Sequence, residues 1–172
     1  MRRLVWLTVL AIALAVPAVG YAVVGGTSDD GTLSVKSGAG RVYLNITGTV
    51  VGRMGEGYIR VTDPNPNDGQ GIQFWGCNAR TSDPSTSTTT CHNTDGIVRF
   101  KAIGGKYQIL ISRGASGIFL SAVGHGYATL NGAGDDPNFP GTFDGTYSVN
   151  DGPYKSLPDD PRTVTLAAPP GG

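Results

Sequence analysis

The sequence predicts an all-β fold, an antiparallel β-sandwich or barrel of about nine or ten short strands preceded by a signal-peptide helix. Three observations predict it. Short stretches alternate apolar and polar residues with a period of two, as half-buried strands do. Segments rich in Gly, Pro, Asn and Asp separate these stretches. Beyond residue 22 no stretch has a long helical periodicity, which argues against an α/β sheet.

Residues 1–22 have the three-part pattern of a secretory signal peptide. Arg2 and Arg3 give a basic start, and an apolar run follows from Leu4 to Val16. Small residues then lead to Ala22, after which we expect cleavage. The alternative is an uncleaved membrane anchor, but the apolar run is short of the about 20 residues that span a bilayer. We therefore expect a secreted or extracytoplasmic protein with no membrane attachment after cleavage.

The remainder of the chain is expected to hold a flexible segment over 23–31, a single β-domain over 32–166 and a disordered tail over 167–172. In the stretch 41–47, Val42, Leu44 and Ile46 share one face and polar residues share the other. Similar stretches predict further strands over 57–63, 96–103, 106–112, 117–123, 126–132, 145–149 and 162–166. Turn residues predict connections at 36–40, 53–57, 63–71 and 112–117.

Charge is sparse and balanced, with 13 basic and 13 acidic residues. Signal cleavage would remove two of the basic residues and leave a slightly acidic domain. Most acidic residues are Asp beside Pro or Gly, where the carboxylate serves turn chemistry. Because the sequence shows no basic patch, we expect no nucleic-acid partner. We also find no phosphate-binding or dinucleotide motif, and we expect no cofactor.

Cys77 and Cys91 are the only two cysteines. In an oxidising compartment two cysteines are expected to form a disulfide, with free thiols or a metal site that uses His92 as alternatives. The bond would close a loop rich in Ser and Thr. We expect this loop to be an exposed, mobile insertion because its composition cannot order it.

Aromatic and polar residues supply the candidate ligand contacts. Trp75 is the best candidate if its ring is exposed, because it precedes Cys77 and alternates with Phe74, so that one ring faces in and the other out. The alternative is that Trp75 covers the edge of the sheet as ordinary packing. Tyr58, Tyr127 and His125 are further candidates. No catalytic residue is singled out.

Weak calcium candidates lie in the segment "TDPNPNDGQG", where Asp63, Asn65, Asn67 and Asp68 offer oxygen ligands. The EF-hand spacing fails, since Gly is absent at the sixth position and Glu at the twelfth. We favour a turn in which Asp and Asn side chains bond nearby backbone N–H groups.

The segments "GRVYLNITGTVVG" and "SAVGHGYATLNG" resemble small secreted bacterial all-β proteins. The resemblance implies the same fold class over most of the domain and brings no activity, ligand or catalytic residue.

The sequence therefore predicts a non-catalytic binding or cell-envelope module, with a carbohydrate or a cell-envelope protein as its partner. The alternative is a small secreted hydrolase with an Asp/His site. Convergence of His125, His92 and an Asp in one pocket would favour the hydrolase, whereas Trp75 on an open face would favour the binding module.

Overall fold

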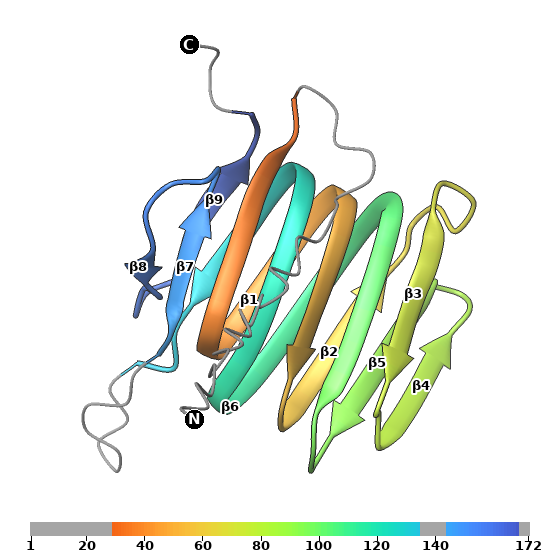
Figure 1. The fold of residues 1–172 in the computed structure, drawn as a ribbon. Helices are drawn as coiled ribbons and strands as arrows, with labels where there is room; N and C mark the ends of the chain where they lie inside the picture. The colour runs from red at the N-terminus through yellow and green to blue at the C-terminus, as the bar shows by residue number, and fades with distance from the viewer. Residues whose placement is uncertain (1–28, 135–143, 169–172) are drawn as a thin grey trace, which may run out of the picture.

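The computed structural model describes residues 29–134 and 144–168, with the backbone alone for 113–116 (Figure 1). These residues form an antiparallel sheet of nine strands, and they include no helix. The predicted all-β antiparallel fold is confirmed. The expected signal peptide, most of the expected N-terminal segment and most of the expected tail lie outside the described residues. The described part contains no helix long and apolar enough to cross a membrane.

Two of the strands are far longer than the sequence predicts. β1 (Gly31–Met54) has 24 residues and β6 (Val98–Asn131) has 34. The turns expected at 36–40 and 112–117 are instead bends inside these strands. Glycines in the left-handed region allow the bends, with φ of 104° at Gly40 and 133° at Gly117. Register shifts in the pairing of β1 with β6 accompany them.

The other strands are short, as expected. They are β2 (Gly57–Thr62), β3 (Gln70–Trp75), β4 (Ala79–Asp83), β5 (Thr88–Asn93), β7 (Thr146–Val149), β8 (Lys155–Ser156) and β9 (Arg162–Leu166). Between β1 and β2 the predicted connection is present as a two-residue turn.

The long strands supply both layers of a sandwich, because each runs along one layer, bends over and returns in the other (Figure 1). We call the first layer the one in which β1 residues 31–38 and 48–54 pair with β6 residues 98–104 and 118–124. Its outer members are β7 with β8 on one side and β3 on the other. In the second layer β1 residues 41–47 lie between β6 residues 106–113 and 126–131. β9 adds to one side of this layer, and β2, β5 and β4 add to the other.

A row of glycines forms one of the bends between the layers. Gly48 pairs with Gly105 on one neighbouring segment and with Gly124 on the other. A Cβ atom on Gly48 would lie 2.2 Å from the carbonyl oxygen of Val123, and one on Gly124 would lie 2.2 Å from that of Thr47. Three neighbouring strand segments therefore pass from one layer to the other at glycines, whose lack of a side chain lets the backbones approach closely.

The core lies between the layers and takes one apolar face from each segment. Its largest buried side chains include Tyr107, Leu33, Leu44, Ile46, Ile109, Ile111 and Leu130. The Tyr107 hydroxyl is buried with its ring and lies 3.1 Å from the carbonyl oxygens of Gln70 and Ile103, to which it donates. The outward residues on each layer are thus carried by strands whose inward side chains are buried in this core.

Candidate ligand-binding site

The candidate site lies on the outer face of the first layer. Register pairing places Phe119, Arg53, Arg99 and Trp75 side by side on four neighbouring segments, in that order. At the usual strand spacing this row is about 14 Å long. Both arginines and Trp75 are exposed, whereas the residues before and after them along the two long strands include buried core positions.

A groove of about 420 Å³ follows this row. Its lining includes the four residues of the row and Lys36, together with Ser34, Val35, Val51, Gly52, Phe100, Leu120 and Ser121. A second hollow of about 210 Å³ shares Arg53 and Phe119 and reaches Ile97. Among the residues that the structure describes, none that lines either space is acidic.

Aromatic rings support the cationic side chains of this face. The guanidinium of Arg53 lies 4.2 Å from the Phe119 ring centre, and Lys36 Nζ lies 3.9 Å from that of Tyr154. Lys101 Nζ lies 5.8 Å from the ring of Trp75. The Tyr154 hydroxyl is 2.9 Å from Ser34 Oγ, and hydrogen bonds with Ser34 and Lys36 lower the pKa of Tyr154. These contacts hold the cations against flat rings and so restrict their movement.

Trp75 ends β3 at the edge of the first layer and is 50% exposed. Phe74 points inward instead, with its ring 6.4 Å from that of Phe100. The predicted alternation of these two aromatic residues is confirmed. The chain then turns at Gly76, which has a φ of 78° and a backbone too close to Ile97 to allow a side chain.

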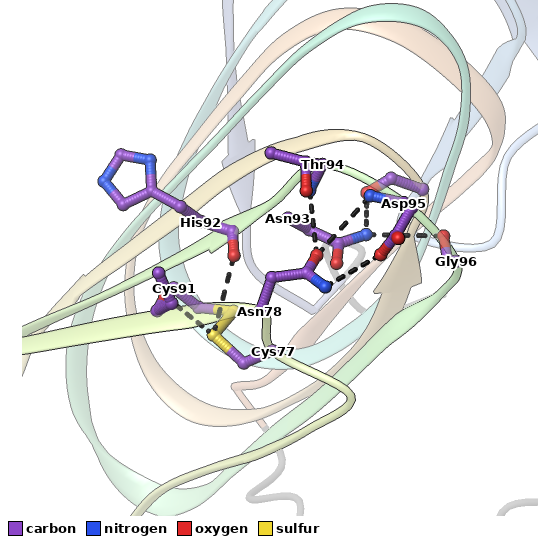
Figure 2. The surroundings of a disulfide bond; sticks show 10 residues. Cys77, Asn78, Cys91, His92, Asn93, Thr94, Asp95 and Gly96 are labelled. Atoms are coloured by element: carbon purple, nitrogen blue, oxygen red, sulfur yellow. Dashed lines mark hydrogen bonds between the residues drawn. A yellow bond between two sulfur atoms is a disulfide. The ribbon is translucent and has the colours of Figure 1, made fainter.

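The next residue, Cys77, forms the predicted disulfide with Cys91 (Figure 2). Their Cα atoms are 5.8 Å apart, a usual separation for a disulfide. Cys91 is buried in β5 of the second layer. The bond therefore ties the chain that leaves Trp75 to the opposite layer.

The segment between the cysteines is largely exposed, as expected, but it is a regular hairpin and not an irregular loop. It forms the hairpin of β4 and β5, with residue pairs from Ala79 and His92 to Asp83 and Thr88. The Asp83 carboxylate fixes the turn, because it accepts hydrogen bonds from Ser85 N at 2.9 Å and Thr86 Oγ1 at 2.9 Å. The Ser85 hydroxyl also donates to Asp83 Oδ1 at 2.6 Å, and this bond, more than the other two, lowers the pKa of Asp83. Thr has a high strand propensity, which the expectation of a loop undervalued.

The imidazole ring of His92 does not form a site with the two cysteines. Figure 2 shows its ring directed away from the sulfur atoms, and the ring lies 5.9 Å from that of Tyr58. The side chain of Asn78 instead organises the adjoining turn. Its amide donates to Asp95 at 2.7 Å and its oxygen accepts from Thr94 N at 2.9 Å (Figure 2).

The other predicted contacts are not gathered with Trp75. Tyr58 and Tyr127 belong to segments of the second layer, with two strand segments between them. Tyr127 packs 6.1 Å from Tyr43. His125 lies at the glycine bend, where its Nδ1 is 3.2 Å from Asp30 Oδ1. Neither histidine lines the groove or the hollow beside it.

The calcium candidates lie in the connection between β2 and β3. Asp63 Oδ1 accepts a hydrogen bond from Asn65 N at 3.2 Å, which is the favoured Asx turn. Asp68 faces the backbone N of Lys106 at 3.3 Å, while Asn65 and Asn67 are exposed. Burial raises the pKa of Asp63, and the charge of Asp68 raises it further. In residues 29–134 and 144–168 no three His, Cys, Asp or Glu side chains are placed to hold a metal. Calcium binding here stays the less favoured alternative to the turn.

Sequence patterns did not predict Arg53, Arg99, Lys36 or Phe119 as contacts. Arg99 and Phe119 lie at outward positions of predicted strands, which alternation could have shown. Lys36 and Arg53 lie in segments predicted as turns, which are instead parts of β1. Their convergence depends on which strands are neighbours, and local patterns do not contain that information. Basic residues that are scattered along the chain therefore meet on one face.

Comparison with known proteins gives no relative from which to transfer a function, because no protein-family model, curated protein or solved structure matches this chain.

Proposed function

We propose that the protein is a secreted, non-catalytic binding module that holds a carbohydrate of its surroundings in the groove beside Trp75. The extracytoplasmic location rests on the signal-peptide pattern of residues 1–22 and on the Cys77–Cys91 disulfide, a bond that persists in oxidising compartments.

One observation carries the proposed function, namely the half-exposed ring of Trp75 at the end of a groove on a rigid sheet. A large aromatic side chain usually buries most of its surface, so a half-exposed tryptophan beside a concavity is typical of a contact surface. Sugar rings have apolar C–H faces that stack on such a ring. Trp75 needs little ordering on binding, because β3 and the disulfide hold its backbone on both sides.

A small hydrolase with an Asp/His site is the second candidate, and one contact favours it. Asp30 lies within hydrogen-bonding distance of His125 Nδ1, as in sites where a carboxylate orients a general base. The pair lies at the bend and contributes nothing to the lining of the groove. The binding module therefore explains more of the features of the outer face.

The test is retention of the oxidised mature protein, residues 23–172, on a panel of neutral and acidic polysaccharides. We expect retention on at least one glycan, and Trp75→Ala should weaken it at least about tenfold through loss of the stacked ring.

Tyr127→Ala is the matched control, because Tyr127 is also a half-exposed aromatic residue but belongs to the other layer. It should bind like the wild type, and circular dichroism should show that both variants are folded. Failure to bind any glycan, or equal binding by the Trp75 variant, would contradict the proposed function.

A further inference from the structure

We propose that the groove selects an acidic polysaccharide, a glycan whose sugars carry carboxylate or sulfate groups, and that Arg53 and Arg99 receive the charge. This inference rests on the proposed carbohydrate-binding function and adds the chemical class of the ligand.

The pairing of the two arginines on the sheet favours an anionic ligand. Arg53 and Arg99 are direct partners across neighbouring antiparallel segments, and both are exposed. Like charges directly opposite one another on a sheet face are destabilising. In the part of the chain that the structure describes, the groove is lined by no acidic residue that could compensate the pair. An anion placed between the two guanidinium groups would offset the repulsion through charge-assisted hydrogen bonds, which arginine forms well with carboxylate and sulfate oxygens.

Aromatic residues flank the arginine pair. Phe119 lies beside Arg53 and Trp75 lies beside Arg99, so each arginine has an aromatic neighbour. Lys36 lines the same groove, and Lys101 lies over Trp75. The row thus offers apolar rings for sugar faces and cations for their acidic substituents, within about 14 Å.

The density of charge distinguishes this ligand from other polyanions. Duplex DNA carries one charge per about 1.7 Å and is bound by many cations spread over a large surface. Here the cations are few, and the domain as a whole is slightly acidic, with 11 basic and 13 acidic residues after residue 22. A polysaccharide with about one charge per sugar ring needs fewer cations than DNA and therefore fits this row better. The concave shape of the groove also suits a polymer chain better than a flat bilayer.

The experiment compares charged polymers with uncharged polymers of the same backbone. Polygalacturonate is paired with its methyl ester, and dextran sulfate is paired with dextran. Trp75 is the reporter, because the other tryptophan of the sequence, Trp6, is removed with residues 1–22. In 50 mM NaCl with a chelator present, we expect the wild type to bind at least one charged polymer about tenfold or more tightly than its uncharged partner.

Three arginine variants test the role of the pair. Arg53→Gln with Arg99→Gln should abolish the preference for the charged polymer, and Arg53→Lys with Arg99→Lys should retain part of it. Arg60→Gln is the control, because Arg60 is an exposed arginine of the second layer, and it should bind like the wild type. Raising NaCl to 500 mM should weaken binding of the charged polymer by screening.

The outcomes separate this inference from the proposed function. Equal binding of charged and uncharged polymers would overturn the inference. Carbohydrate binding would remain in place if retention on the polysaccharides is then reduced by Trp75→Ala but not by the double glutamine variant. Binding of no polysaccharide would overturn both. Tighter binding of phosphatidylglycerol vesicles or of poly(dT) than of either charged polysaccharide would show that the face serves a different polyanion and would also overturn the inference.

Discussion

At Gly48 the fold depends on the absence of a side chain. Its φ is 151°, and an added Cβ would meet the Val123 carbonyl at 2.2 Å and Gly124 Cα at 2.7 Å. Both obstacles are backbone atoms of a paired segment, so no rotamer change can relieve the contact. We expect Gly48→Ala to lower the free energy of unfolding by roughly 3 kcal/mol, as measured by urea denaturation.

Gly71 provides the control for this substitution. It lies in β3 with nothing within 4 Å of an added Cβ. Gly71→Ala should therefore change the free energy of unfolding by no more than about 0.5 kcal/mol. A similar effect at both positions would show that the close approach of the backbones at Gly48 is not limiting.

Sequence patterns predicted the face of a strand on which a side chain lies better than they predicted which strands are neighbours. Alternation predicted that one of Phe74 and Trp75 faces outward, because side chains of a strand alternate between faces, and the structure shows that it is Trp75. The pairing of Arg53 with Arg99 did not follow, since it depends on the register between β1 and β6. Tyr58 and Tyr127 were grouped with Trp75 on residue type alone, and their layer could not be read from it.

At the scale of elements, the β4–β5 hairpin is the part of the sheet that the disulfide secures. Every residue of β4 is exposed, and β4 pairs only with β5 among the described strands. Little apolar burial therefore holds it in place. Replacing both cysteines by alanine should lower the free energy of unfolding by about 3 kcal/mol, the value for closure of a loop of about 15 residues.

Hydrogen exchange would locate this effect, because amides of residues 79–83 should lose protection more than those of β2. Thiol titration of the denatured wild type, without reductant, is the companion measurement and should find no free thiol. Unchanged stability in the double alanine variant would mean that the Thr-rich pairing alone holds the hairpin. That pairing includes Thr62 with Thr88 at 2.8 Å and Ser82 with Thr89 at 3.3 Å, between their hydroxyl oxygens.

Element boundaries were predictable where Pro and Asn interrupt the chain, as between β2 and β3. They were not predictable at Gly40 and Gly117, because glycine can end a strand or bend it with equal ease. The choice between ending and bending the strand depends on the neighbouring segment, which stays paired with it on both sides of the bend.

At the scale of the whole molecule, the two layers cannot unfold independently, because β1 and β6 are shared between them. Trp75 fluorescence reports on the first layer, whereas far-ultraviolet circular dichroism reports on both. We expect the two signals to give the same urea midpoint for residues 23–172, as cooperative unfolding requires. Separate midpoints would show that the strands can fray in one layer while they remain paired in the other.

The two ends of the described β-domain are joined by hydrogen bonding. Ala168 N donates to the carbonyl oxygen of Asp29 at 2.9 Å, and β1 begins where β9 ends (Figure 1). A short linker could therefore connect them, and a circular permutant opened in the exposed connection at 64–67 would keep every strand whole. In such a chain the new ends would leave the molecule at the connection between β2 and β3, and the original entry and exit would become an internal loop.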